Sequence, residues 1–276
     1  MNIQVGARHI GQGSPCFVMA EVGLAHDGSL MQAHAYIDAI RAAGADAAKF
    51  QCHLGDPTTE WRVRLVRSQD RSRQDYWRRT GFTGAEWAGL SSHCREVGLE
   101  FVCSPFSVEA VRMMDPLLEL WKVPSGRVAD LGLLDAVGRT GKPALVSSGM
   151  STTAEAQFAL KRLLEHGCPV GLMQCTSVYP CPPEALGLPL VKEWHGLSDH
   201  SGTIFPGIAA AALGCEVLEV HVCWSREAGG FDVPASVTVE ELRLLVEGVR
   251  FVETAMRPVD KDKLADTLSN TRQVFM

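Results

Sequence analysis

The sequence predicts an α/β fold, a (β/α)8 TIM barrel with a short N-terminal hairpin, and three observations support this prediction. Eight short apolar runs recur along the 276 residues, each with the length of a strand that is buried on both faces. A longer amphipathic stretch follows nearly every run, and such alternation over about 250 residues is typical of the barrel. The sequence lacks the GxGxxG and GxxxxGKS/T motifs, which would favour the main alternative, a doubly wound nucleotide-binding sheet.

The chain begins with a segment that alternates apolar and polar residues around a glycine, IQVGARHIGQG (3–13). This pattern indicates a hairpin that plugs the bottom of the barrel. The eight predicted strands follow in this order: CFVMAEV (16–22), DAAKFQ (46–51), EFVCSP (100–105), LWKVPS (120–125), PALVSSG (143–149), VGLMQCT (170–176), HGLSDH (195–200) and VLEVHV (217–222).

Predicted helices follow most of the strands, and local signals mark their ends. Ser or Thr stands at several starts, where its hydroxyl can cap the helix, and glycine follows several ends, as in AAGAD, EVGLE and EHGCP. The clearest helices are Leu30–Ala43, Thr83–Val97, Ser107–Met114, Thr153–Glu165 and Thr238–Thr254. Residues 52–80 form a long Arg-rich insertion after the second strand, which is typical of a functional loop such as a lid.

Composition and charge exclude several classes of protein. The net charge of −6 argues against a nucleic-acid-binding protein. No stretch of about 18 residues is apolar enough to span a membrane, and the N-terminus lacks the apolar core of a secretory signal. Nine cysteines without a CxxC pair indicate reduced, buried thiols. We therefore expect one catalytic domain, residues 1–276, located in the cytoplasm.

Polar side chains follow the predicted strands at the end of a barrel where catalytic groups gather. Two lysines with several hydroxyls suit a phosphorylated or carboxylated anion. Two histidines on adjacent strands, with a carboxylate, suit a first-row divalent metal. The residues at these strand ends are Glu21, Lys49, Gln51, Ser104, Lys122, Ser125, Arg127, Ser147, Ser148, Ser177, Tyr179, Ser198, Asp199, His200 and His221.

Each of these features also has a structural interpretation. Lys49 and Lys122 lie in apolar runs and could pair with barrel glutamates, although a buried lysine usually marks a site or a partner. Singly, His200 and His221 are better explained as structural histidines; together, at adjacent strand ends, they favour a ligand pair. The Arg-rich stretch 62–79 is interpreted as a solvated face, and most other histidines, with His26 as the exception, as surface residues.

At these positions the sequence resembles the sialic acid synthase family (N-acetylneuraminate synthase, NeuB-like). Its members condense phosphoenolpyruvate with an amino sugar to make 2-keto-3-deoxy acids. The resemblance covers residues 1–256, the barrel domain of the family, and rests on eight motifs in order: AEVGLAHDG (20–28), GADAAKFQ (44–51), CSPFS (103–107), KVPSG (122–126), SSGMST (147–152), QCTSVYPCPP (174–183), GLSDHS (196–201) and GCEVLEVHV (214–222).

The resemblance implies roles for the matched residues. Positions that hold phosphoenolpyruvate are matched by Lys49, Ser104, Lys122, Ser125, Ser147, Ser177, Tyr179 and Ser198. His200 and His221 match two ligands of a divalent metal, Mn²⁺ with Mg²⁺ or Co²⁺ as alternatives, and no organic cofactor is implied. Glu21 matches a carboxylate near the reacting carbon, while Gln51 and Asp232 match positions that touch the acceptor sugar.

These roles imply a mechanism in which Glu21, Lys49, Lys122, His200 and His221 are the catalytic set. The metal polarises the acceptor aldehyde, and C3 of phosphoenolpyruvate attacks the aldehyde carbon. Water, oriented by the carboxylate or the metal, then adds to C2, and phosphate leaves by C–O cleavage. The lysines and hydroxyls position the substrate and stabilise its charge.

The chain departs from the family pattern at four points. Arg127 replaces the family's glutamate on the acceptor, and a guanidinium prefers an anion, so we expect an acceptor other than N-acetylmannosamine, namely an anionic aldehyde. The run Ala25-His26-Asp27-Gly28 replaces Asn-His-Asn-Gly, and Ser177 replaces an asparagine. The family's C-terminal antifreeze-like domain is not matched, so Arg127 or an arginine of 62–79 is expected to replace its arginine. A homodimer through barrel contacts is compatible with the sequence.

Three functions remain open on the sequence alone. The leading hypothesis is a metal-dependent, phosphoenolpyruvate-using, C–C bond-forming transferase in carbohydrate biosynthesis. The second is a metal-dependent pyruvate aldolase, which would release no phosphate. The third is a non-catalytic ligand-binding barrel, against which the retention of Glu21, both lysines and both strand-end histidines argues. The expected partners are phosphoenolpyruvate and an aldehyde, with no nucleic acid and no membrane.

Overall fold

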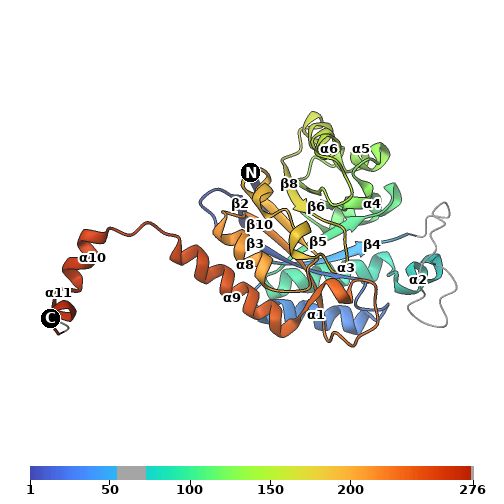
Figure 1. Cartoon of the computed structure of the whole chain (residues 1–276). Coiled ribbons are helices and arrows are strands. Elements are labelled where there is room, and N and C mark those ends of the chain that lie inside the picture. The colour runs from blue at the N-terminus through green and yellow to red at the C-terminus, as the bar shows by residue number, and fades with distance from the viewer. Residues whose placement is uncertain (55–72, 275–276) are drawn as a thin grey trace.

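The computed structural model describes residues 1–54 and 73–274. A closed barrel of parallel strands forms its centre, and helices surround it (Figure 1). The strands pair in sequence order from β3 to β10, and β10 pairs with both β9 and β3, which closes the barrel. The predicted (β/α)8 fold is confirmed. A short strand, β11, also pairs in parallel with the end of β10.

The strands lie where the apolar runs predict them. Their bounds are β1 Asn2–Val5, β2 Arg8–Gly11, β3 Phe17–Gly23, β4 Ala47–Cys52, β5 Glu100–Pro105, β6 Leu120–Val123, β7 Ala144–Ser147, β8 Val170–Cys175, β9 Gly196–Asp199, β10 Val217–Cys223 and β11 Ser236–Thr238.

The helices include all five that the sequence marks most clearly. Their bounds are α1 Leu30–Ala42, α2 Arg73–Thr80, α3 Gly84–Val97, α4 Val108–Met114, α5 Leu131–Gly138, α6 Thr153–Glu165, α7 Val191–Trp194, α8 Phe205–Ala212, α9 Val239–Ala255, α10 Lys261–Thr267 and α11 Ser269–Val274. Capping boxes at Thr83, Thr152 and Thr238 start α3, α6 and α9, because each hydroxyl accepts from a backbone N–H that the helix leaves unpaired.

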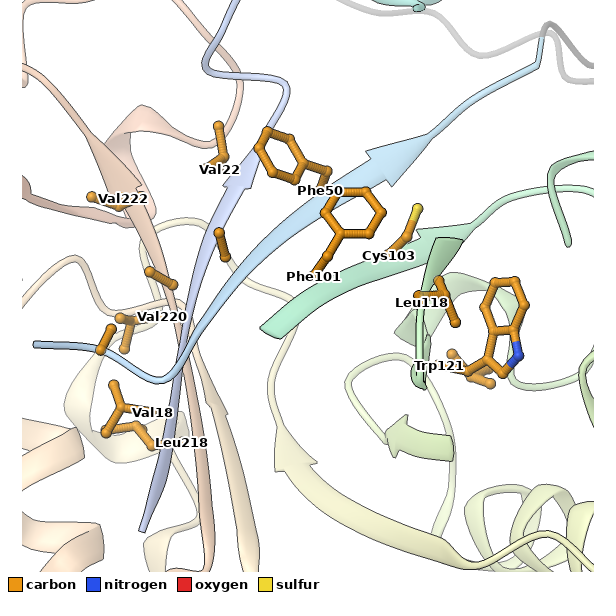
Figure 2. Close-up of a cluster of buried hydrophobic side chains, with 14 of the residues drawn as sticks. Val18, Val22, Phe50, Phe101, Cys103, Leu118, Trp121, Leu218, Val220 and Val222 are labelled. Atoms are coloured by element: carbon orange, nitrogen blue, oxygen red, sulfur yellow. The ribbon is translucent and has the colours of Figure 1, made fainter. Parts of the chain in front are cut away.

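Strand pleating sorts the side chains into an outer and an inner set. On β3 and β10 the outward set includes Val18, Val22, Leu218 and Val220, which pack towards the helices (Figure 2). The inward set alternates with it. Its lowest members are apolar and fill the bottom of the barrel: Phe17, Met19, Ala47, Val102, Leu120, Leu145, Met173 and Val217.

The N-terminal hairpin closes the bottom of the barrel as predicted. Strands β1 and β2 pair antiparallel, and Ile3, Val5 and Ile10 are buried against the lowest inward layer. This plug keeps water out from below, so the polar inward residues above it are reached only through the opposite mouth.

Two peripheral segments differ from a minimal barrel. Within the insertion expected at 52–80, residues 55–72 lie outside the described part of the chain and residues 73–80 form α2. Beyond α9, helices α10 and α11 extend away from the barrel (Figure 1). Among the described residues, no helix is both long and apolar enough to cross a bilayer.

Candidate active site

Directly above the apolar layer, the next inward position of nearly every strand is polar. This second layer is the floor of the mouth, and none of its members is more than 4% exposed. Its members are Glu21 on β3, Lys49 on β4, Ser104 on β5, Lys122 on β6, Ser147 on β7, Ser198 on β9 and Glu219 on β10. Since a charged side chain is almost never buried without a partner, this layer has to be explained by its contacts.

The two lysines of the floor share one buried carboxylate. Glu219 lies 3.4 Å from Nζ of Lys122 and 3.7 Å from Nζ of Lys49, and Ser198 donates to its Oε1 at 2.9 Å. Lys122 also donates to Ser147 Oγ at 2.6 Å, and Lys49 pairs closely with Glu21. The floor therefore holds two cations and two anions in one connected network, with no net charge.

Burial and pairing shift the ionisation of this network. Burial lowers the pKa of Lys49 to about 8, against the opposing effect of Glu219. Burial alone would raise the pKa of Glu219, but the lysines outweigh it and lower that pKa to about 2. Near neutral pH Lys49 is therefore a cation and Glu219 a carboxylate.

Above the floor, hydroxyl groups gather where β6, β7 and β8 end. Ser125 lies in a short 3-10 turn after β6, and its Oγ is 2.9 Å from Oγ of Ser177. Ser177 N–H donates to the carbonyl of Gly149 at 3.3 Å. Below them in the floor, Ser104 Oγ on β5 is buried and has no hydrogen-bond partner among the described residues. An unpaired buried hydroxyl in the same layer as two lysines is a donor available to an anion.

Gly149 permits this gathering, and its replacement tests the site. A Cβ at this position would lie 2.2 Å from Ser177 Oγ and 3.0 Å from Ser125 Cβ. We therefore expect Gly149→Ala to push the hydroxyls apart and weaken binding of inorganic phosphate or phosphoenolpyruvate by about tenfold or more. Gly89→Ala on α3 is the matched control, because a Cβ there meets nothing within 4 Å. Calorimetric titration of both variants measures these affinities, and equal affinities of Gly149→Ala and Gly89→Ala for the ligand would contradict the assignment.

Two histidines stand together on the rim. The rings of His200, after β9, and His221, on β10, have centroids 5.3 Å apart. His200 Nδ1 donates to the Thr176 carbonyl at 3.0 Å, so its Nε2 accepts the Tyr179 hydroxyl at 3.0 Å. Burial lowers the pKa of both histidines, that of His221 well below its usual value. Both rings are therefore neutral, the form in which imidazole binds metals.

The histidine pair has the chemistry of metal ligands but does not by itself complete a metal site. The carbonyl bond of His200 fixes the tautomer that leaves the lone pair on Nε2, as in many metal-ligating histidines. In this structure that lone pair accepts from Tyr179. Among the described residues, however, no three His, Cys, Asp or Glu side chains form a group that could hold an ion. The pair therefore fits a metal that takes its remaining ligands from water or substrate.

Two of the three predicted acceptor residues, Gln51 and Asp232, meet Glu21 around one glycine. Gly23 has a φ of +55°, and a Cβ there would lie 3.2 Å from Glu21 Oε1 and 3.3 Å from both Gln51 Nε2 and Asp232 Oδ2. Asp232 Oδ2 is also 3.9 Å from His221 Nδ1. Glu21, Gln51 and Asp232, which are far apart in the sequence, thus converge beside the histidine pair.

Arg127 lies on the rim, two residues after Ser125 in the same turn. Its Nη1 is 3.3 Å from Oδ2 of Asp130, and the other oxygen of Asp130 caps α5 by accepting from Leu133 N–H. The guanidinium is thus anchored locally and is about a quarter exposed, at 24%.

Helix α2 covers the side of the mouth next to Gln51. The Arg79 guanidinium donates to Asp27 Oδ1 at 2.6 Å, and a Cβ on Gly28 would lie 2.3 Å from the Arg79 carbonyl. Tyr76 and Trp77 pack with Leu24 in a small apolar cluster. Asp27, one of the departures from the family pattern, therefore holds α2, while Arg78 is 75% exposed, as expected for a solvated face.

Glu219 and His53 were missed by the sequence analysis. Glu219 shares the pleat face of His221, two residues away on β10. His53 was assigned to the surface, but its ring is stacked between Trp77 and Phe106 and contacts Gln51. His26 is fully buried, and burial lowers its pKa to about 4; it accepts from Gly28 N–H and stabilises the loop after β3.

Comparison with known proteins identifies one sequence family and relatives named as sugar acid synthases. A sequence model described as the NeuB family matches residues 36–261. The mouse N-acetylneuraminate-9-phosphate synthase is 31% identical over 93% of this chain and 76% of its own length. The N,N'-diacetyllegionaminic acid synthase of Campylobacter jejuni is 28% identical over 87% of this chain and 77% of its own.

Solved structures agree on the fold. The N-acetylneuraminic acid synthetase of Leptospira borgpetersenii, crystallised with citrate, superposes with a TM-score of 0.84 at 24% identity and covers 98% of this chain and 96% of that chain. The spore coat polysaccharide biosynthesis protein SpsE of Bacillus subtilis gives a TM-score of 0.81 at 26% identity, over 94% and 75% of the two chains.

Proposed function

The chain belongs to the NeuB family, and from this premise we propose that it is an enzyme of carbohydrate biosynthesis that condenses phosphoenolpyruvate with an aldehyde acceptor. The products are a 2-keto-3-deoxy acid and inorganic phosphate. One observation carries the proposal: two buried lysines and a ring of serine hydroxyls line the floor and wall of a mouth that is closed from below. Relatives named as sugar acid synthases support it.

We assign phosphoenolpyruvate to the floor and to the β6–β8 wall. Lys49 and Lys122 provide positive charge, and the surrounding hydroxyls provide donors. The substrate contacts are assigned to Lys49, Ser104, Lys122, Ser125, Ser147, Ser177, Tyr179 and Ser198. Residues 1–276 are proposed to act as one catalytic domain, since the barrel strands alone extend from Phe17 to Cys223. The proposed location of the protein is the cytoplasm.

The bonds formed and broken in the proposed reaction balance without a further reactant besides water. C3 of phosphoenolpyruvate forms a bond to the aldehyde carbon, whose oxygen becomes a hydroxyl. Water adds to C2, and the C2–O bond to phosphate breaks, which leaves the keto group. Glu21, on the acceptor side and paired with Lys49, is placed to orient that water and to accept its proton.

A divalent metal fits the charge balance of the site. The floor is neutral, with two lysines against two glutamates, whereas phosphoenolpyruvate carries about 2.5–3 negative charges, of which the phosphate supplies about 1.5–2. His200 and His221 would hold the metal, with Mn²⁺ preferred to Mg²⁺ or Co²⁺. When bound, such an ion would polarise the aldehyde oxygen of the acceptor.

We assign the acceptor to Gln51 and Asp232, which converge at Gly23, and to Arg127, which lies in the turn after β6. Because Arg127 presents a cation where a neutral sugar needs none, the acceptor is proposed to be an anionic aldehyde other than N-acetylmannosamine. Arg127→Glu should shift preference from anionic towards neutral acceptors, and an unchanged preference would contradict this assignment.

The pH dependence of phosphoenolpyruvate binding tests the role of Lys49. Lys49 is cationic below its pKa of about 8 and neutral above it, so affinity should fall about tenfold per pH unit above 8. Lys49→Arg should remove the decline, because arginine stays charged throughout this range. Calorimetry between pH 6 and 10 measures both profiles, and a parallel decline in the arginine variant would assign the titration to another group.

Release of inorganic phosphate tests the function itself. Purified protein is incubated with phosphoenolpyruvate and Mn²⁺, with and without chelator, against neutral hexosamines, aldoses, uronic acids and sugar phosphates. We expect chelator-sensitive release with one class of acceptor. Condensation of free pyruvate without phosphate release would instead favour the aldolase.

A further inference from the structure

A polar column runs along β4 and the residue after it, from the floor towards the rim. Lys49 and Gln51 alternate with outward residues on β4 and therefore face the mouth, and His53 follows directly after the strand ends at Cys52. Lys49 pairs with Glu21, Gln51 Nε2 donates to Glu21 Oε1 at 3.0 Å, and His53 Nε2 lies 3.0 Å from Gln51 Oε1. The column thus ends on a histidine that no role assigned above uses.

The donor and acceptor in each hydrogen bond of this column can be assigned in only one way. A carboxylate only accepts, so the Gln51 amide must turn its NH₂ group towards Glu21. Its carbonyl oxygen then faces His53, and His53 Nε2 must carry the proton. Were the amide flipped, its carbonyl oxygen would face the Glu21 carboxylate, and two buried acceptors would repel each other.

Packing holds the histidine ring in the plane that this bond requires. The His53 ring is stacked on Trp77 at 4.7 Å with an interplanar angle of 7° and on Phe106 at 3.8 Å with an angle of 25°. Trp77 is buried on α2, which is tied to the loop after β3 by Arg79 and Asp27. A ring enclosed on both faces cannot rotate its donor away from Gln51.

From this geometry we infer that His53 is a positioning residue for the acceptor: it locks the Gln51 amide with its NH₂ group towards Glu21 and the acceptor. The inference rests on the proposed function. The second N–H of that amide is then a donor beside the space that Gly23 leaves without a Cβ. It suits a hydroxyl or carbonyl oxygen of the bound aldehyde. When His53 cannot donate, the amide loses one of the two hydrogen bonds that fix this orientation and is held only by Glu21.

Two substitutions separate the hydrogen bond from the packing. His53→Phe keeps an aromatic ring between Trp77 and Phe106 but removes the donor. His53→Gln loses the ring but places an amide N–H near the position of Nε2. His34→Phe is the control, because His34 also lies against a ring, that of His93, but lies between α1 and α3.

Kinetics on the acceptor that supports phosphate release give the first readout. His53→Phe should raise the KM for the acceptor about 10- to 100-fold and leave the KM for phosphoenolpyruvate unchanged, while His53→Gln should recover most of the loss. A purely structural role would instead affect both KM values or spare His53→Phe. Acceptor KM equal to wild type in a folded His53→Phe protein overturns the inference.

The second readout needs no turnover. In protein labelled with ¹⁵N-glutamine, the side-chain NH₂ signals of Gln51 are identified by their loss in Gln51→Glu. We expect them to shift in His53→Phe, return towards wild type in His53→Gln and stay unchanged in His34→Phe. If the wild type releases no phosphate with any acceptor, the proposed function fails, while these signals still decide whether His53 orients Gln51; unshifted signals in His53→Phe contradict it.

Discussion

Replacing Lys122 with methionine is expected to lower kcat/KM for phosphoenolpyruvate by at least about 1,000-fold, equivalent to about 4 kcal/mol. Lys122 lies fully buried in the floor, where it donates to Ser147 and faces Glu219. In so dry a site its charge acts on the substrate with little screening by water. Methionine fills a similar volume without the charge, so the decrease in kcat/KM measures the contribution of the positive charge of Lys122.

The control for this experiment is a lysine without a place in the site. Lys161→Met on the exposed side of α6 should leave the kinetics unchanged. Circular dichroism and thermal unfolding establish that both variants fold. A folded Lys122→Met protein with near-normal kcat/KM would show that the floor does not contribute to catalysis.

Replacing Glu219 with glutamine is expected to reduce the free energy of unfolding by about 3–5 kcal/mol, because the change leaves buried lysine charge without its partner. Glutamine keeps the shape of the side chain and an oxygen that can accept from Ser198. The loss would therefore come from the missing negative charge. Urea unfolding of wild type and variant measures it.

The same variant makes a second prediction that a simple packing defect does not. An added anion can replace the missing carboxylate, so inorganic phosphate should stabilise Glu219→Gln by more than it stabilises the wild type. Glu227→Gln, on an exposed loop after β10, is the neutral control. Equal stabilisation of all three proteins by phosphate would show that Glu219 does not compensate the lysines.

Much of the site could be predicted because strand pleating is regular. The alternation in DAAKFQ and LWKVPS already places Lys49 and Lys122 on the face opposite their apolar neighbours, and both lie in the floor. The same rule would have found Glu219, which lies two residues from His221 on β10. It does not reach His53, because β4 ends at Cys52.

Other features depend on contacts between distant segments and could not be predicted. The rings that enclose His53 come from α2 and from the residue that follows β5. The meeting of Glu21, Gln51 and Asp232 depends on the closure of the barrel between β10 and β3. By contrast, the pairing of Arg127 with Asp130 is local, three residues apart, and its spacing was visible in the sequence.

The most direct test of the account is the identity of the product. Wild-type protein is incubated with phosphoenolpyruvate, a divalent metal and the acceptor that supports phosphate release, and the mixture is analysed by mass spectrometry alongside a phosphate assay. The account predicts one new compound with the mass of the acceptor plus pyruvate, formed in equal amount to phosphate and absent without acceptor. Phosphate accompanied by free pyruvate, or product formed from pyruvate alone, would contradict it.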